Sequence, residues 1–332
     1  MKVAVLGAGS WGTTLAIVLE NNGHEVTLWE FNKKYAKNLN KKRENEIFLP
    51  GVKIPDAIEI TNDIEKAIEN KQMIVIAIPT QFIRGSLEKL KNHDFKDTIF
   101  VSVSKGIEKK TLLTVSGIIK DVLKKVNKDR IGALSGPSHA EEVSRKIPTA
   151  VTVAANDENI ARVIQTAFGN SYFRVYYTTD LIGVELGGAF KNVIAIGAGI
   201  IDGVGFGDNT KAAIMTRAIA EITRLGMELG ARRETFAGLS GIGDLIVTCM
   251  SKHSRNRYVG EQIGKGKKLK EIIASMKMVA EGVETCKSVN ELASKLQVDV
   301  PISKAVYEIL YNDADPQMVT YELMTRSMKP EY

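Results

Sequence analysis

Residues 1–12 read MKVAVLGAGSWG, and this stretch decides the fold. A short apolar run leads directly into the pattern Gly-x-Gly-x-x-Gly at Gly7, Gly9 and Gly12. That order predicts a β-strand, a tight turn and a helix, which is the setting in which the pattern binds a dinucleotide. Gly7 permits the turn, Gly9 lets backbone amides approach the pyrophosphate, and Gly12 lets the helix lie close to the strand. The free N–H groups at the start of the helix then face the phosphates.

A glutamate follows at the distance that such a site uses. Glu30 lies 18 residues after Gly12 (30 − 12), at the end of a second predicted strand. An acid in that place accepts hydrogen bonds from the adenosine ribose. The alternative is a surface glutamate with no ligand. The pattern indicates that a dinucleotide binds, but it does not name a reaction.

Residues up to about 180 alternate short apolar runs with helical patterns. Such alternation predicts a parallel sheet with helices on both faces. The predicted strands are Val3–Leu6, Glu25–Trp29, Ile58–Thr61, Met73–Ile78, Thr98–Ser102, Gly132–Ser135, Ala150–Ala154 and Tyr172–Thr178. The predicted helices are Gly12–Asn21, Asn32–Lys42, Asp63–Glu69, Phe82–Lys91, Thr111–Val126 and Glu158–Phe168.

The pattern changes after Asp180, where helical periodicity dominates and strand patterns almost disappear. The predicted helices here are Leu181–Ile201, Lys211–Gly230, Glu261–Met276, Val283–Leu296 and Ile302–Tyr311. We therefore predict an α/β N-terminal Rossmann-like dinucleotide-binding domain over residues 1–180. An all-α C-terminal substrate domain is predicted over residues 181–332.

Composition excludes several classes of protein. A hydrophobic share of 44% with 25% charged residues is that of a globular chain rather than a disordered one. The two cysteines, Cys249 and Cys286, form no metal-binding motif, so we expect no metal, and isolated thiols suit the reducing cytoplasm. The start of the chain lacks the features of a signal peptide. The most apolar later stretch, 181–207, contains charged residues, so we expect no integral membrane segment.

The net charge of +6 has two readings. One is a solvated basic surface, and the other is a field that attracts an anionic substrate. No basic stripe carries interleaved aromatic residues, so we expect no nucleic-acid partner.

Lys191 lies in a predicted helix that is unusually rich in glycine, with Gly183, Gly187, Gly188, Gly197 and Gly199. Each glycine inside a helix costs about 1 kcal/mol relative to alanine. Close approach of a ligand or of a second backbone would explain the cluster. A lysine in such a place is partly desolvated, so its pKa falls and it can exchange protons near neutral pH. The alternative is a solvated lysine.

A second polar cluster follows the sequence Gly241-Ile242-Gly243-Asp244-Leu245. Ser254 can cap the helix after it, which would put Arg255 and Asn256 at the positive end of that helix. Capping donors with a guanidinium make a phosphate site. The alternative is an ordinary helix cap with surface arginines.

Taken together, these motifs resemble the bacterial NAD(P)-dependent glycerol-3-phosphate dehydrogenase family over essentially the whole chain. The resemblance rests on the order and spacing of motifs at 7–12, 104–106, 135–138, 187–197, 241–244 and 254–257. It implies an oxidoreductase that interconverts sn-glycerol 3-phosphate and dihydroxyacetone phosphate and supplies glycerol 3-phosphate for glycerophospholipid synthesis. It also implies a small phosphorylated three-carbon substrate and a homodimer.

The resemblance also implies residue roles. Lys191 matches the catalytic proton donor and acceptor, and Lys105 matches a lysine that contacts cofactor and substrate. Asp244, Asn192 and Thr248 match active-site positions. The matched substrate contacts are Lys105, Gly136, Ser138, Lys191, Asp244, Ser254, Arg255 and Asn256. The matched cofactor contacts are Gly7, Gly9, Ser10, Trp11, Gly12, Glu30, Lys105, Ala140, Arg255, Val279 and Glu281.

The cofactor segment departs from the family in one respect. Many members carry a basic residue just after the second strand, suited to a 2′-phosphate, whereas this chain has Glu30 there and Lys33 one short turn later. We therefore expect NAD(H) to be favoured, with NADP(H) as the alternative.

Two other readings remain open from the sequence. One is a reductase of the β-hydroxyacid dehydrogenase type, where the asparagine lies about a turn after the lysine rather than beside it. The other is a non-enzymatic protein that senses NAD(H).

Overall fold

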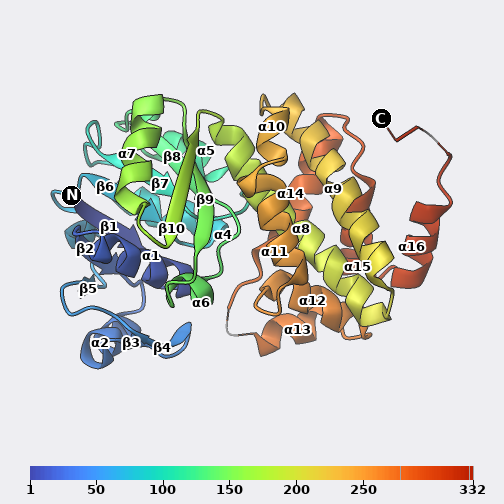
Figure 1. Cartoon of the computed structure of the whole chain (residues 1–332), viewed down its shortest axis with the longest axis horizontal. Helices are drawn as coiled ribbons and strands as arrows, with labels where there is room; N and C mark the ends of the chain where they lie inside the picture. Colours follow the sequence, from blue (N-terminus) through green and yellow to red (C-terminus); the bar gives the residue numbers. More distant parts are fainter. Residues whose placement is uncertain (277, 329, 332) are drawn as a thin grey trace.

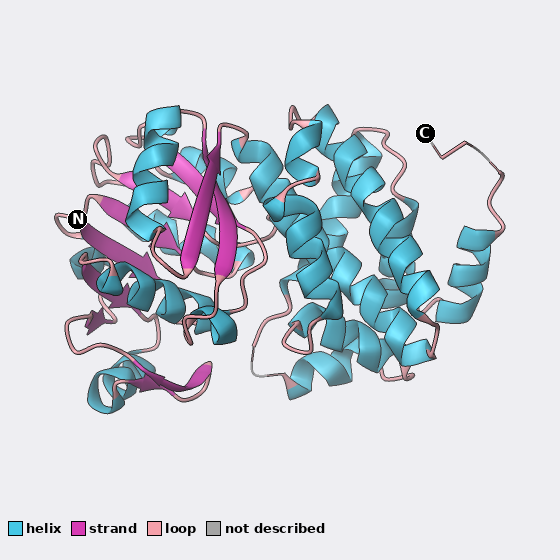
Figure 2. Cartoon of the chain, in the orientation of Figure 1, coloured by secondary structure: helices cyan, strands magenta, loops and turns pink. Residues whose placement is uncertain are grey.

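The computed structural model describes residues 1–276, 278–328 and 330–331. A twisted sheet with helices on its faces occupies the N-terminal part, and helices alone make up the rest (Figures 1 and 2). The last strand ends at Thr178 and the long helix α8 begins at Leu181. The domain boundary expected at residue 180 stays a prediction, and it falls between these two elements.

The sheet is built outward from the first strand. β1 (Lys2–Leu6) pairs in parallel with β2 (Glu25–Trp29) on one side and β6 (Met73–Ile76) on the other, and Val3 lies opposite both Val26 and Met73. The strand order is β10-β9-β8-β7-β6-β1-β2-β5, so the chain reverses direction across the sheet at β1. Ligands of doubly wound sheets bind at such a switch point, beyond the carboxyl ends of the strands.

The remaining elements of this part follow in chain order. They are α1 (Ser10–Asn21), α2 (Lys33–Lys42), β3 (Glu44–Asn45), β4 (Leu49–Lys53), β5 (Glu59–Thr61), α3 (Ile64–Ile68), α4 (Thr80–Leu87), β7 (Ile99–Ser102), α5 (Val115–Val122), β8 (Ile131–Ser135), α6 (Ala140–Val143), β9 (Thr149–Ala155), α7 (Glu158–Phe168) and β10 (Phe173–Thr178).

The prediction of a wholly parallel sheet was wrong at one place. β9 runs antiparallel to β8, with Ser135 opposite Thr152, whereas β10 is again parallel to β9. The connection from β8 to β9 contains only the short helix α6. No crossover helix therefore carries the chain back to the end of the sheet where the parallel strands begin. The hairpin of β3 and β4 was also missed, because its strands are short and mostly polar.

Two predicted helices had the wrong extent. The helix expected over 111–126 is confined to α5, because Lys110 and Leu112 adopt positive φ angles of 69° and 58° and keep the preceding turn out of the helix. The helix expected over 261–276 is divided into α12 (Arg255–Gly264) and α13 (Leu269–Ser275). Gly266, with φ of 87°, turns the chain between them.

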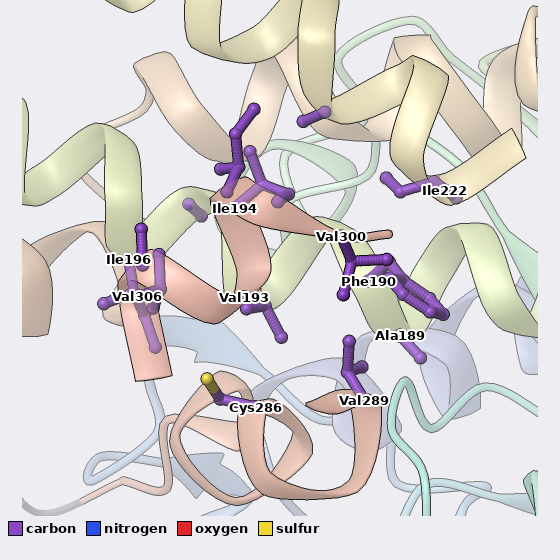
Figure 3. Close-up of a cluster of buried hydrophobic side chains, with 14 of the residues drawn as sticks. Ala189, Phe190, Val193, Ile194, Ile196, Ile222, Cys286, Val289, Val300 and Val306 are labelled. Atoms are coloured by element: carbon purple, nitrogen blue, oxygen red, sulfur yellow. The ribbon is translucent and has the colours of Figure 1, made fainter. Parts of the chain in front are cut away.

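The C-terminal part surrounds α8 (Leu181–Val204), which is buried over most of its length. Its other helices are α9 (Asp208–Glu228), α10 (Arg233–Phe236), a π-helical turn (Leu239–Gly243), α11 (Asp244–Met250), α12, α13, α14 (Glu281–Lys295), α15 (Pro301–Tyr311) and α16 (Pro316–Met324). Figure 3 shows Phe190 and Val193 of α8 among side chains from α9, α14 and α15.

By length and composition α8 is apolar enough to cross a membrane, and it alone meets that test among the described residues. Its most apolar window is 100% buried within the protein. That is the situation of the central helix of a folded domain.

A second backbone explains part of the glycine pattern of α8. A Cβ atom at Gly199 would lie 2.0 Å from the carbonyl oxygen of Arg257, and one at Gly203 would lie 2.3 Å from that of Glu261. From the other helix, a Cβ at Gly260 of α12 would lie 1.9 Å from the carbonyl oxygen of Ile196. Side chains are therefore excluded where α8 and α12 cross.

We predict that Gly260→Ala destabilises the protein by about 1–3 kcal/mol or more, because the methyl group forces α8 and α12 apart. The matched control is Gly85→Ala in α4, where an added Cβ meets no atom within 4 Å. That change should be neutral or stabilise by up to about 1 kcal/mol. Urea unfolding followed by circular dichroism measures both, and equal effects of the two substitutions would contradict the explanation.

Candidate active site

A buried carboxylate joins the two parts of the molecule. Asp244 begins α11 and is only 1% exposed. Its Oδ2 atom accepts a hydrogen bond from Lys105 Nζ at 2.5 Å, and its Oδ1 atom lies 2.7 Å from Lys191 Nζ. Lys105 belongs to the loop after β7, whereas Lys191 and Asp244 belong to the helical part. The three charges therefore meet where the sheet part contacts the helical part, an interface called the seam below.

The end of β8 holds the same carboxylate. Ser135 Oγ donates to Asp244 Oδ2 at 3.1 Å, and the backbone N–H of Gly136 donates to it at 3.3 Å. Lys105 Nζ also donates to the carbonyl oxygen of Gly136, at 3.3 Å. Gly136 has φ of 144°, a value that favours glycine, so the chain can turn sharply here.

Local glycines let Asp244 and Lys191 reach this place. A Cβ at Gly241, in the π-helical turn before Asp244, would lie 2.1 Å from the carbonyl oxygen of Phe236. A Cβ at Gly188 would lie 2.7 Å from Ser135 Oγ. The helix that carries Lys191 can therefore approach the end of β8 only where it lacks a side chain.

Thr248 fixes the ammonium group of Lys191 from the other side. Lys191 Nζ donates to Thr248 Oγ1 at 2.7 Å, and that hydroxyl donates in turn to the backbone oxygen of Asp244 at 2.6 Å. Because Thr248 already uses its proton, it acts as an acceptor toward lysine. The side chain of Lys191 is 10% exposed, so it is desolvated but not sealed from a ligand.

Burial lowers the pKa of Lys191 to about 8, with the charge of Lys105 acting in the same direction and Asp244 opposing them. Burial by itself would raise the pKa of Asp244, but Lys105 and Lys191 outweigh it and hold that pKa below its ordinary value. Asp244 therefore stays ionised while Lys191 can gain or lose a proton near neutral pH. The alternative of a freely solvated lysine was wrong.

Two buried amides connect the lysines to the start of α12. Asn192 Nδ2 donates to the carbonyl oxygen of Lys105 at 2.9 Å, and Asn256 Nδ2 donates to Asn192 Oδ1 at 2.8 Å. The backbone N–H of Gly282 completes the chain with Asn256 Oδ1 at 2.9 Å. These hydrogen bonds also establish the side-chain orientation of each amide, because a flipped amide would place two acceptors or two donors together.

Glu281 lies beside Gly282 and contacts the sheet part. Its Oε1 atom accepts from the backbone N–H of Thr80 at 2.8 Å and from Thr80 Oγ1 at 3.0 Å. It thereby caps α4, which begins beyond the carboxyl end of β6. The role of Glu281 as a cofactor contact stays a prediction.

The start of α12 has the features of an anion site. Ser254 Oγ accepts from the backbone N–H of Arg257 at 3.2 Å, which confirms the predicted helix cap. Arg255 is exposed, and its Nη1 donates to the carbonyl oxygen of Val279 at 2.8 Å. Arg257 instead pairs with Asp202 through Nε at 2.7 Å. The guanidinium of Arg255 therefore retains further donors for a ligand.

The loop after β1 fits a dinucleotide pyrophosphate. Gly7 has φ of 115°, and a Cβ there would lie 2.6 Å from the carbonyl oxygen of Ala77. A Cβ at Gly12 would lie 1.9 Å from that of Gly7, whereas one at Gly9 would meet no atom within 4 Å. Within the described part of the chain no side chain caps α1, so its first N–H groups are available to phosphate oxygens. Ser10 and Trp11 occupy that first turn, and Trp11 Nε1 is a buried donor with no hydrogen-bond partner among the residues that the structure describes.

Glu30 directly follows β2 and is 4% exposed, so the alternative of a surface glutamate was wrong. Its Oε1 atom accepts from the backbone N–H of Asn32 at 2.9 Å. Burial raises its pKa above the ordinary value, and that hydrogen bond opposes the shift. The first residue of α2, Lys33, is exposed.

The structure gathers most of the predicted site residues into two clusters. One is the lysine and carboxylate cluster with its amides, and the other is the loop of Gly7–Gly12. Ser138 and Ala140 lie between them: Ser138 Oγ donates to the Gly136 carbonyl oxygen at 3.0 Å, and the Ala140 oxygen accepts from Thr14 Oγ1 at 3.4 Å. Val279 contacts Arg255, as described above.

Sequence reasoning missed two residues of the site. Ser135 ends a predicted strand, and its place beside Gly136 was a usable signal. Thr80 gave no such signal, because its partner Glu281 lies 201 residues away in the chain.

The chain is similar to known proteins over almost its whole length. A family model described as NAD-dependent glycerol-3-phosphate dehydrogenase N-terminus matches residues 2–161, and the corresponding C-terminus model matches residues 180–321. A protein of Chlorobium phaeobacteroides (strain BS1), named glycerol-3-phosphate dehydrogenase (NAD(P)+), is 52% identical over 331 residues. That match covers 100% of this chain and 99% of the relative.

A second relative and a solved structure agree. A glycerol-3-phosphate dehydrogenase of Salinibacter ruber is 51% identical over 99% of this chain and 97% of its own length. The crystal structure of a glycerol-3-phosphate dehydrogenase from Coxiella burnetii has a TM-score of 0.93 and 34% identity. It covers 98% of this chain and 99% of the crystallised one.

We predict that the ammonium group of Lys191 titrates near pH 8 and that Asp244→Asn lowers this midpoint further. The substitution removes the one strong influence that favours the charged form, while burial and Lys105 remain. Lysine side-chain NMR on folded protein, with the signal assigned by Lys191→Met, measures both midpoints.

The control is Asp121→Asn, which removes an exposed acid paired with Arg84 and should leave the midpoint unchanged. A native midpoint at the ordinary lysine value of 10.5, or one that Asp244→Asn does not lower, would contradict the electrostatic account.

Proposed function

This chain belongs to the NAD-dependent glycerol-3-phosphate dehydrogenase family, and on that premise we propose that it interconverts sn-glycerol 3-phosphate and dihydroxyacetone phosphate. The observation that carries the proposal is the buried Asp244 carboxylate between Lys105 and Lys191. The Asp244 carboxylate holds Lys191, the lysine that exchanges a proton, in a fixed position at the seam. Membership of this family also decides against a β-hydroxyacid dehydrogenase-type reductase and a non-enzymatic sensor.

Lys191 is the proposed proton donor. When bound, NAD(P)H would supply a hydride to C2 of the ketone. The ammonium form of Lys191 would donate a proton to the C2 oxygen as negative charge develops there. In the reverse direction the neutral amine of Lys191 accepts the hydroxyl proton. A pKa of about 8 makes both forms accessible near neutral pH.

The surrounding residues position this proton. Asp244 and Thr248 contact Lys191 Nζ, so the amine has a defined direction from which it meets the substrate. Lys105, Gly136 and Ser138 lie on the opposite side of the seam and are proposed substrate contacts, with Lys105 also contacting the cofactor. Asn192 and Asn256 hold Lys105 and the start of α12 in register.

Arg255, with Ser254 and Asn256 at the start of α12, is the proposed site of the substrate phosphate. Binding a group remote from C2 fixes the reacting carbon beside Lys191. Arg255, Val279 and Glu281 are proposed cofactor contacts. Glu281 contacts the first residue of α4, Thr80, and Arg255 contacts Val279.

We also propose how the chain is organised and where it acts. The chain would comprise a cofactor domain over residues 1–180 and a substrate domain over 181–332, and would act as a homodimer in the cytoplasm. Its product would supply glycerophospholipid synthesis. The homodimer and the use of the product follow from the family, whereas the domain boundary follows from the change of sequence pattern near residue 180 and the cytoplasmic location from the isolated thiols.

We predict that Lys191→Ala lowers kcat by at least about 10²–10⁴-fold but leaves NADH binding nearly intact, because a positioned acid and its charge are lost. In the native enzyme, kcat/KM for ketone reduction should be constant below pH 8 and fall above it, as the ammonium loses its proton. Oxidation should rise with pH through the same range. Steady-state rates and NADH fluorescence test this, and near-normal kcat in the variant would remove Lys191 from its role.

We predict that Arg255→Leu raises KM for dihydroxyacetone phosphate strongly, because a charge-assisted contact worth about 1.5–3 kcal/mol disappears. Activity on unphosphorylated dihydroxyacetone, which is expected to be poor, should change much less. Arg257→Leu is the comparison, since Arg257 is already paired with Asp202. Equal loss of kcat/KM on both substrates in Arg255→Leu would refute a phosphate contact.

We predict at least about tenfold higher kcat/KM with NADH than with NADPH, or roughly 1.4 kcal/mol. A buried carboxylate at Glu30 accepts from a ribose hydroxyl but repels a 2′-phosphate. Glu30→Ser should lose much of the ratio by gaining activity with NADPH. A native preference for NADPH, or a ratio that the substitution leaves untouched, would show that Glu30 does not choose the cofactor.

A further inference from the structure

A polar cavity lies between the sheet part and the helical part of the molecule, away from Lys191. Its volume is about 400 Å³, and its walls come from α5, the β9–α7 and β10–α8 connections, the start of α8 and the α9–α10 connection. Ile182 lines it, nine residues before Lys191 on the same helix (191 − 182), which is a rise of roughly 14 Å. None of Lys105, Lys191 and Asp244 lines this cavity. It is therefore a different place from the active site.

The cavity contains two cations from opposite sides of the seam. Lys120 comes from α5 and Arg232 from the connection after α9, and both line the wall. Arg232 Nη2 donates to Thr179 Oγ1 at 2.9 Å. Over residues 1–276, 278–328 and 330–331, neither cation forms an ion pair with a carboxylate. Both therefore keep hydrogen-bond donors for a ligand.

The carboxylate that lines the cavity, Asp180, is occupied by other donors. Asp180 accepts from the backbone N–H groups of Gly183 at 3.0 Å and Arg232 at 2.9 Å, and from Thr235 Oγ1 at 2.5 Å. These contacts use both of its oxygens. Asp180 thus caps α8 and does not neutralise the guanidinium of Arg232 by direct contact.

Glu185 is satisfied in the same way, one turn further along α8. It accepts from Ser116 N–H at 2.7 Å, from Ser116 Oγ at 2.6 Å and from Thr114 Oγ1 at 2.9 Å. The two buried acids weaken the positive field at the cavity. The wall therefore favours an anion that makes direct hydrogen bonds with Lys120 and Arg232 over one attracted only by charge.

We propose that this cavity binds a small phosphate monoester, with its phosphate group between Lys120 and Arg232. A guanidinium offers paired donors that match two phosphate oxygens, and an ammonium adds a point charge. The volume lies within the usual range of small-molecule sites and leaves room for an organic group beside the phosphate. Thr179 and Asn156 supply polar wall groups for that part. The bound ester connects α5 to the α9–α10 connection and so stabilises the folded chain.

Isothermal titration with glycerol 2-phosphate tests the site. The titration uses full-length Arg255→Leu, so that the proposed substrate-phosphate contact is removed. It should show one saturable site with a raised unfolding temperature. Adding Lys120→Gln and Arg232→Gln should weaken affinity by at least about tenfold.

The matched control adds Lys124→Gln and Arg233→Gln, which remove the same charges from nearby residues that do not line the cavity. Its affinity should stay within about twofold of the Arg255→Leu parent. The proposal would be overturned if Arg255→Leu showed no saturable binding of glycerol 2-phosphate. It would also be overturned if the two pairs of added substitutions lowered the affinity equally. Inorganic phosphate should bind more weakly than the ester, and equal affinity would refute a site for esters. Because binding is measured without turnover, the result is independent of the proposed reaction.

Discussion

The Asp244 carboxylate is the interaction on which the active site depends. It is almost fully removed from water, and an unpaired charge there would be strongly unfavourable. Lys105, Lys191, Ser135 and the Gly136 N–H together make its ionised form stable. Because these donors come from the end of β8, the loop after β7 and α8, satisfying one carboxylate also aligns the sheet with the helices. Burial and the charges of Lys105 and Asp244 together give the buried Lys191 a pKa at which it can exchange a proton.

The backbone approach of α8 to its neighbours makes that alignment possible. Gly188 lets α8 reach Ser135, and Gly199 and Gly203 let it lie against α12. The first contact positions Lys191, and the others position the helix that begins with Arg255. The proposed acid–base residue lies on α8 and the proposed phosphate site at the start of α12. Glycines allow these two helices to lie close together. The glycine pattern is therefore a requirement of the site as much as of the fold.

The sequence was most informative where chemistry is local. The strand, glycine loop and helix at residues 1–12, the cap at Ser254 and the unusual helix around Lys191 follow from neighbouring residues. The antiparallel β9 was beyond such reasoning, because strand direction depends on where the connection returns the chain. The periodicity of residues 261–276 predicts one helix, because it does not reveal that Gly266 adopts the positive φ angle that separates α12 from α13.

Contacts between distant segments were equally beyond reach. Nothing near Thr80 indicates that Glu281 caps its helix, and nothing near Lys191 alone fixes Asp244 as its partner. The family resemblance supplied the latter residue as part of the site, and the structure gives the physical reason for its position. The hydrogen bonds of Asn192 and Asn256 likewise form only where distant segments of the chain meet. The periodicity of a sequence does not predict such meetings.

The central claim is that Lys191, held by Asp244, exchanges the proton of the substrate's C2 oxygen. A crystal structure with NAD⁺ and dihydroxyacetone phosphate tests it most directly. The account predicts Lys191 Nζ within about 2.6–3.2 Å of the C2 oxygen, with Asp244 still contacting Nζ and the phosphate at Arg255. A C2 oxygen out of reach of Lys191, with another protein group hydrogen-bonded to it, would contradict the account.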